Sequence, residues 1–323
     1  MSRTDRACGL TVIARALGPA ILGVLLAGCA TEPDKPVVAE SDELYSGQPR
    51  AVYGTEFPAG SAAEAALRGD IALAKGDFDR ALYFYVEAVR LEPEHVPTLL
   101  KIGAVHRRRG DDDRALASYR RVLAIEPDNA HALEGAGLVL LDRRAHDAAR
   151  DLLDRAVARD PGRWRAYEGL GVLADLRGDH EQAIENYAVA LKVQPGQASL
   201  YSNRGYSRYL AGDLPGAEAD FRAALHVDPR FERAWRNLGL VHVRQQRFEE
   251  ALKSFERVED RAAALNDVGY LAMLEGHYGI AETYLSEALV ASPTYYRVAD
   301  ENLERTRQRR AQAELAAATD TGK

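Results

Sequence analysis

The sequence predicts an all-α solenoid of about seven helix-turn-helix repeats, and three ladders of residues predict it. Glycines mark one position of every unit: Gly69, Gly103, Gly137, Gly171, Gly205, Gly239 and Gly269. Alanines keep step with them: Ala81, Ala115, Ala149, Ala183, Ala217, Ala251 and Ala281. Prolines close six of the units: Pro93, Pro127, Pro161, Pro195, Pro229 and Pro293. A fixed period of 34 residues is typical of stacked supersecondary units, so function is expected on a surface made by the stack.

The amino terminus, residues 1–28, predicts a lipoprotein signal peptide. Three arginines precede an uncharged apolar run of 15 residues, which is short for a bilayer span but fits the apolar region of a secretory signal. The run ends in Leu-Ala-Gly-Cys at residues 26–29, which resembles the lipobox of bacterial lipoproteins. The resemblance implies cleavage before Cys29, attachment of a diacylglyceryl group to its thiol, and acylation of the new amino terminus. An ordinary signal peptide, or an uncleaved anchor with a chance cysteine, is the alternative.

The residue after the cysteine bears on location. Ala30 stands where an aspartate retains enterobacterial lipoproteins at the inner membrane. By that resemblance the protein is expected at the periplasmic face of the outer membrane, held by its lipid. The chain has two cysteines, Cys8 and Cys29, so the mature protein is expected to hold neither a disulfide nor a cysteine metal site.

Charge narrows the range of partners. The chain carries 42 basic and 49 acidic residues, and removal of the signal peptide takes away three and one, which leaves 39 against 48, a net charge of −9. An acidic chain is poorly suited to wrapping nucleic acid or coating an anionic leaflet. Contact with the membrane is therefore expected through the lipid alone.

Residues 29–61 are predicted to form the lipidated cysteine and a flexible linker. Prolines lie among Glu, Ser, Gly and Thr with no sustained period, and such a composition cannot bury enough apolar area to fold. The alternative, a short ordered stretch around residues 44–53 that binds a partner, has no further support in the sequence.

The repeat array is predicted over residues 62–295. Its units are 62–95, 96–129, 130–163, 164–197, 198–231, a shortened 232–261, and 262–295. In the fourth unit apolar residues recur at helical spacing on both sides of Gly178 and Asp179, which indicates a helix, a tight turn and a second helix.

Each unit resembles the tetratricopeptide repeat, whose pattern has a large residue at position 4, a small one at 8, alanine at 20, an aromatic at 24 and proline at 32. Position 4 includes Tyr167, Tyr201 and Trp235. Position 24 holds Tyr85, Tyr119, Leu153, Tyr187, Phe221, Phe255 and Leu285. The resemblance implies a right-handed α-solenoid. Small residues at 8 and 20 let two helices approach closely, the aromatic fills the wedge between units, and proline ends the second helix.

The end of the array departs from the pattern. The sixth unit lacks four residues and its closing proline, and loss of about one helical turn is expected to tilt the seventh unit. A harmless deletion is the alternative, and no function is assigned to it. Residues 296–323 are predicted to form a polar capping helix and a disordered tail, because repeat arrays need capped ends.

Two core positions of the fifth unit carry arginine, Arg204 and Arg208. An unpaired buried charge is too costly to keep. Asp220, on the facing helix, is placed to pair with Arg204, and repeats of the Asn-Arg-Gly type resemble this arrangement. We interpret Arg204 and Asp220 as a structural ion pair.

By family resemblance the first helices line a concave groove, whose character changes along the array. Units two to four present mixed charge: Arg107, Arg108, His131, Glu134, Asp142, Arg165, Glu168 and Asp175. Units five to seven present apolar and aromatic residues: Tyr206, Tyr209, Leu210, Leu240, Val243, Tyr270, Met273 and Leu274. These residues lie opposite the core stripe, which favours a recognition surface for an amphipathic helix or an extended segment. The alternative is that the superhelix closes on itself or that the C-terminal helix fills the groove.

Motifs for catalysis are not found. The eight histidines show no metal-ligand or metalloprotease spacing, and the run of aspartates at 111–113 is explained by helix capping. The sequence also lacks the groove asparagine with which one family variant clamps a peptide carboxylate. We expect a non-enzyme with no cofactor, metal, nucleic acid or small-molecule substrate.

The layout of signal, lipid, linker and repeats resembles pilus-assembly lipoproteins, namely the tight-adherence (Tad/Flp) pilus lipoprotein and the type IV pilotins. That resemblance implies an adaptor whose groove holds a protein partner such as a secretin while the acyl chains supply membrane affinity. An envelope scaffold for β-barrel assembly or cell-wall enzymes is a second hypothesis. An enzyme with an unrecognised site is a third.

Overall fold

The computed structural model describes Leu44 and residues 59–320. The predicted signal peptide, Cys29 and most of the predicted linker lie outside the described residues. Within the described part the protein is all-α, and the prediction of the fold class is confirmed.

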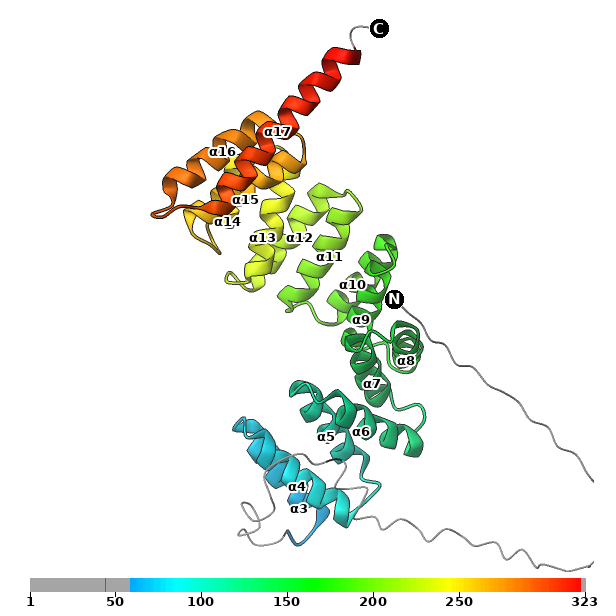
Figure 1. Ribbon diagram of the computed structural model, residues 1–323. Coiled ribbons are helices and arrows are strands. Elements are labelled where there is room, and N and C mark those ends of the chain that lie inside the picture. The colour runs from blue at the N-terminus through cyan, green and yellow to red at the C-terminus, as the bar shows by residue number, and fades with distance from the viewer. Residues whose placement is uncertain (1–43, 45–58, 321–323) are drawn as a thin grey trace, which may run out of the picture. The chain divides into compact units, whose positions relative to one another are not determined.

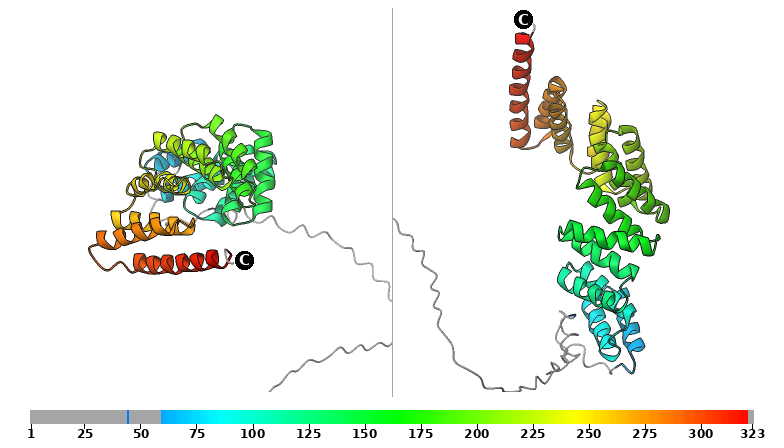
Figure 2. Two further views of the ribbon diagram at one scale, coloured as in Figure 1. Left: turned by 90° about the horizontal axis from the view of Figure 1, so that it is seen from above. Right: turned by 90° about the vertical axis from the view of Figure 1, so that its right-hand side faces the viewer.

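Each repeat consists of two helices that pack against each other, and consecutive pairs follow one another along the array (Figure 1, Figure 2). The pairs are α3 Ala62–Ala74 with α4 Phe78–Leu91, α5 Val96–Arg108 with α6 Asp112–Ile125, α7 Ala130–Asp142 with α8 His146–Arg159, α9 Trp164–Asp175 with α10 His180–Val193, α11 Ala198–Leu210 with α12 Leu214–Val227, α13 Glu232–Arg244 with α14 Phe248–Phe255, and α15 Arg261–Leu274 with α16 Tyr278–Ala291. A last helix, α17, spans Arg297–Asp320.

A short turn joins the two helices of each unit, and local chemistry fixes it. In the fourth unit Gly178 has φ of +77°, a conformation that glycine adopts without a steric penalty, and Asp179 then caps α10 by accepting a hydrogen bond from the backbone N–H of Gln182. Arg144 and Gln246 take the same conformation in the third and sixth units, each with φ of +60°. Capping and turn geometry therefore end the first helix and start the second.

The glycine ladder sets how closely the helices approach. A Cβ atom added at Gly103 would lie 2.7 Å from Cε1 of Tyr119, and the same ring also lies against Gly135 of the next unit. Tyr119 thus occupies the wedge between the second and third units, and only glycine leaves room for its ring. Tyr85, Tyr187 and Phe221 repeat this packing and are fully buried.

The shortening of the sixth unit falls in its second helix. Helix α14 has 8 residues, whereas α12 and α16 have 14 each. The expected tilt of the seventh unit stays a prediction.

Helix α17 packs beside α16 at the end of the array (Figure 1, Figure 2). Ala299 and Leu303 are buried, and Leu303 joins an apolar cluster with Met273 and Leu285. Asn302 Nδ2 donates a hydrogen bond of 2.9 Å to Asn266 Oδ1. The helix therefore covers the last repeat, as a cap does. Along the part of the chain that the structure describes, no helix is both long and apolar enough to cross a membrane.

One residue of the predicted linker packs into the array. Leu44 is 3% exposed and belongs to the apolar cluster of the first two units. Its carbonyl oxygen accepts a hydrogen bond of 2.7 Å from His106 Nε2. Because a carbonyl can only accept, the His106 ring carries its hydrogen on Nε2. Leu44 therefore fastens the chain to the array well before the first helix begins.

This contact predicts a pH dependence of stability. His106 is fully buried, and burial lowers its pKa below the ordinary 6.5, against the opposing effects of Leu44 and Asp111. Below pH 6.5 the unfolded chain binds a proton there that the folded chain does not, so stability falls as pH falls, by up to about 1.4 kcal/mol per pH unit until the folded pKa is reached. His106→Gln keeps a donor but cannot titrate. Urea unfolding at pH 7.5 and 5.5 should show a larger loss of stability in the wild type than in this variant. Parallel losses would contradict it.

Candidate functional site

A groove of about 540 Å³ lies across α9, α11 and α13, with Tyr187 of α10 at its edge. Its apolar lining is Val172, Leu176, Tyr206, Leu210 and Leu240. Its polar lining is Asp175, Ser202, Asn203, Arg233 and Asn237. First helices of three consecutive repeats thus contribute to one surface.

The apolar part of this surface is open to solvent. Leu176 is 60% exposed, and Tyr206 and Leu210 are each 42% exposed. The rings of Tyr206 and Tyr209 stack with centroids 6.1 Å apart, and the Arg244 guanidinium lies 5.2 Å from the Tyr209 ring. Large apolar side chains without core packing are characteristic of binding surfaces.

The structure brings together only part of the predicted groove set. Tyr206, Leu210 and Leu240 line the cavity, and Tyr209 stacks beside it. Leu274 is 49% exposed but lies outside the cavity lining.

Val243 and Met273 correct the prediction, because each is 1% exposed and neither reaches the groove surface. Val243 belongs to the core cluster that includes Leu265 of the next unit, and Met273 to the cluster that includes Leu303 of α17. Tyr270 is half-buried against the same cluster as Met273. At these positions the next helices along the array cover the side chains.

Polar groups along the groove were missed by sequence reasoning. Asn203 Nδ2 donates a hydrogen bond of 3.3 Å to Glu168 Oε1, and Arg233 Nη1 donates one of 3.5 Å to Asn203 Oδ1. Burial raises the pKa of Glu168, while nearby arginines oppose that shift. Asn237 makes no hydrogen bond within the described residues, so its amide remains available to a ligand backbone. Asn203 and Asn237 occupy the same position in adjacent units, and that spacing is the signal that could have found them.

The arginines of the fifth unit converge on one carboxylate. Arg204 donates to Asp220 through Nε at 2.9 Å and Nη2 at 2.6 Å, and Arg208 Nη1 donates to it at 2.9 Å. Asp220 is 3% exposed. The three side chains hold α11 against α12 and do not line the groove.

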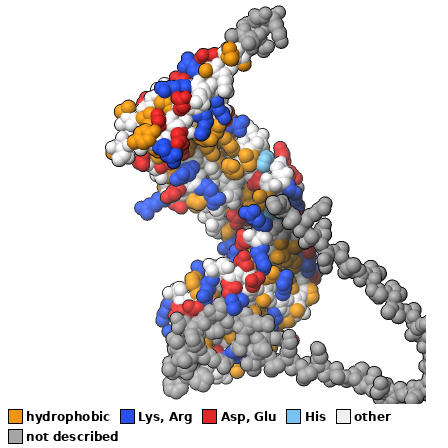
Figure 3. Space-filling view, in the orientation of Figure 1, with side chains coloured by type: hydrophobic (Ala, Val, Ile, Leu, Met, Phe, Trp, Pro, Cys, Tyr) orange, Lys and Arg blue, Asp and Glu red, His pale blue; other side chains and the backbone are white. Residues whose placement is uncertain are grey.

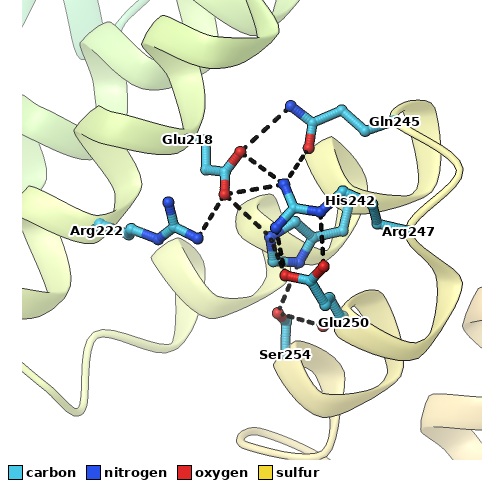
Figure 4. Close-up of polar contacts among 7 residues, drawn as sticks. All are labelled: Glu218, Arg222, His242, Gln245, Arg247, Glu250 and Ser254. Carbon is cyan, nitrogen blue, oxygen red and sulfur yellow. Dashed lines mark hydrogen bonds and ion pairs between the residues drawn. The ribbon is translucent and has the colours of Figure 1, made fainter.

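A second polar cluster surrounds His242 (Figure 4). Its Nδ1 lies 3.3 Å from Ser254 Oγ, and its Nε2 lies 3.5 Å from Glu218 Oε1. Ser254 is 3% exposed, and its hydroxyl donates to the Glu250 carbonyl at 2.8 Å. A buried hydroxyl held in this way is not placed to attack a substrate. No group of three or more potential metal ligands occurs in the described part of the chain.

Comparison with known families identifies the repeats. Two models match, one described as "Tetratricopeptide repeat protein 21 C-terminal ARM domain" over residues 64–204 and one as "Tetratricopeptide repeat" over residues 202–267. The chain is a tetratricopeptide repeat protein. Such proteins act as scaffolds that bind protein or peptide partners, and they are typically non-enzymatic.

Solved structures of other tetratricopeptide repeat proteins resemble this one. A protein from Parabacteroides merdae is 19% identical, and the match covers 77% of this chain and 99% of that chain with a TM-score of 0.53. PilF of Pseudomonas aeruginosa is 16% identical over 66% of this chain and 97% of its own, with a TM-score of 0.51. MamA is 30% identical over 50% of this chain and 94% of its own, with a TM-score of 0.44. The first two share the fold. A search of curated proteins found no match.

Proposed function

We propose that this tetratricopeptide repeat protein is a lipid-anchored adaptor of the bacterial envelope, and that the groove across α9, α11 and α13 holds a segment of another envelope protein. The observation that carries the proposal is the exposed apolar surface of Leu176, Tyr206 and Leu210 beside the unpartnered amide of Asn237. Apolar side chains supply affinity, and amide groups can bind the backbone of an extended segment.

The groove suits a peptide better than a small substrate. Its polar groups, Asn203, Arg233 and Asn237, lie on two successive helices, so they can contact backbone groups along a segment. Arg233 brings a positive charge, which favours an acidic residue in the segment. The stacked rings of Tyr206 and Tyr209 provide a rigid aromatic platform at the exposed edge.

The membrane part of the proposal rests on the sequence. The lipobox-like residues that end in Cys29 support acylation, and Ala30 supports placement at the periplasmic face of the outer membrane. The order of lipid, linker and repeats supports a role in assembling or localising a pilus or secretion component such as a secretin. In this role the groove holds the partner while the acyl chains hold the complex at the membrane.

A photo-crosslinking experiment in cells tests both parts. A crosslinking residue at Tyr206 should capture one envelope protein, whereas the same residue at Val290, which is 87% exposed and outside the groove, should not. Cys29→Ser should move the protein, with its adduct, from the membrane fraction to the soluble fraction. Equal capture at the two positions would refute the groove, and membrane retention of the serine variant would refute the lipid anchor. A captured secretin or pilus protein would support the assembly role, and a β-barrel assembly factor would refute it.

A further inference from the structure

A second groove of about 510 Å³ lies between α12 and α14, with α13 as its floor. Trp235, Leu238 and His242 form the floor, and basic side chains stand along both rims. It shares no lining residue with the groove across α9, α11 and α13. An inference drawn from it is therefore independent of the proposed function.

The repeat relates this groove to an earlier place in the chain. His242 follows His106 by 242 − 106 = 136 residues, which is four periods of 34. The same shift takes Ile102 to Leu238 and Ser118 to Ser254. Both serine hydroxyls donate a hydrogen bond of 2.8 Å to the carbonyl four residues before them. The first two units and the fifth and sixth therefore build their grooves in the same way.

In the first two units this place holds a leucine. Leu44 is 3% exposed there, and its carbonyl accepts the hydrogen bond from His106 Nε2. The protein thus shows what its own groove binds, which is a leucine side chain together with its backbone carbonyl.

In the fifth and sixth units the equivalent imidazole has no such partner. His242 is 4% exposed, and its Nε2 makes no hydrogen bond in the described part of the chain. The nearest carboxylate oxygen, Glu218 Oε1, lies at 3.5 Å, which is longer than a hydrogen bond (Figure 4). Burial lowers the pKa of His242, so the ring is neutral near pH 7 and one of its nitrogens can donate to a carbonyl.

The rims of the two grooves differ in charge. Arg222 and Lys253 of the second groove replace Val86 and Ala117 of the first. The single acidic residue of the second lining, Glu250, is paired with Arg247. The surface view shows acidic and basic side chains interspersed over the face that it presents, so a groove rimmed mainly by basic residues departs from the general pattern (Figure 3).

The shortened sixth unit adds to this difference. In the second and third units an arginine donates to the carbonyl of the preceding closing proline, as Arg121 does to Pro93 at 2.9 Å. Arg257 is the equivalent residue, but Trp235 Nε1 already donates to the Pro229 carbonyl at 3.0 Å. Arg257 instead lies 5.2 Å from the Trp235 ring, beyond the end of α14 at Phe255. The deletion therefore leaves an arginine available at the rim.

We propose that the groove between α12 and α14 binds a partner segment in which acidic residues precede a leucine. The leucine would pack on Leu238 and Trp235, its carbonyl would face His242, and the acidic residues would meet Arg222, Lys253 and Arg257. The segment before the array has this chemistry, since Glu40, Asp42 and Glu43 precede Leu44. That segment is fastened to the first two units within the same chain, so a separate partner is the occupant of the second groove.

A fluorescence titration of the full chain tests the proposal. The chain has two tryptophans, so Trp164→Phe leaves Trp235 as the sole reporter on the groove floor. The probe is a synthetic peptide with the sequence of residues 39–47, Ala-Glu-Ser-Asp-Glu-Leu-Tyr-Ser-Gly. It should change Trp235 emission in a saturable manner. Replacing the peptide leucine by glycine should weaken binding about thirtyfold, as loss of a buried leucine does.

Two protein variants assign the contacts. His242→Phe removes the hydrogen bond and should weaken binding about tenfold. Lys253→Glu is exposed, does not depend on core packing, and should weaken binding at least as much, whereas Arg309→Glu on α17 makes the same charge change elsewhere and should have no effect. Unchanged Trp235 emission, or equal affinity of the leucine and glycine peptides, would overturn the proposal. Self-association of the chain that the peptide reverses would assign the groove to a second copy and also overturn it.

Discussion

Replacement of Asp220 by alanine is expected to lower the free energy of unfolding by about 3 kcal/mol, because it leaves two arginines without their shared carboxylate. The Asp220 side chain is 4% exposed, and those of Arg204 and Arg208 are 18% and 26% exposed. Partial access to water keeps the effect toward the lower end of what a fully buried pair would show. Urea unfolding followed by circular dichroism measures it.

The matched control is an exposed pair. Asp113 binds Arg143 at 2.7 Å, but its side chain is 87% exposed, so Asp113→Ala should change stability by less than about 1 kcal/mol. A triple variant with Arg204→Met, Arg208→Leu and Asp220→Leu should recover most of the stability, since apolar residues can replace a buried ion network. Equal effects of the two single substitutions would contradict a buried structural role for Asp220.

The repeat pattern predicted the fold because each ladder position has a single physical task. Gly103 must be small since the Tyr119 ring occupies the space where its Cβ would be. The alanine and proline ladders act through equally local constraints, namely helix contact and helix ending. Seven repetitions of such constraints leave little freedom in the secondary structure, and the helix pairs follow from them.

The candidate groove was only partly predictable, because repeat position does not tell what covers a side chain. Tyr206 and Val243 were both assigned to the concave face, yet Tyr206 is 42% exposed and Val243 only 1%. The difference arises from packing against the following helices, which depends on the neighbouring unit. The period gives the direction of a side chain, whereas its burial also depends on tertiary contacts.

Leu44 shows a second kind of information that the sequence does not offer openly. A single leucine in a polar, proline-containing segment has no periodicity, and composition predicts a flexible linker there. Its binding site was nevertheless visible as a repeated position, since His106 and His242 are separated by four periods. The link between the two histidines became evident only when one of them was seen to bind the Leu44 carbonyl.

Tyr119→Ala is expected to lower the free energy of unfolding by about 4 kcal/mol, the range for removal of a large buried aromatic side chain. The ring is 4% exposed and lies between Gly103 of the second unit and Gly135 of the third. Its loss leaves a cavity at the contact between two units, because glycines on both sides cannot fill it. Tyr295→Ala, at a tyrosine that is 74% exposed, should change stability by less than about 0.5 kcal/mol.

The location of this effect is as informative as its size. In a stack of repeats, stability is a sum of unit and interface terms, so damage at one interface should uncouple the units on either side. Hydrogen exchange should therefore rise in α3 to α6 of the Tyr119→Ala variant and remain unchanged in α15 and α16. A uniform rise along the whole array would show that the seven units unfold as one cooperative block. In that case Tyr119 would stabilise the entire array, and the wedge between two units would not be a local boundary.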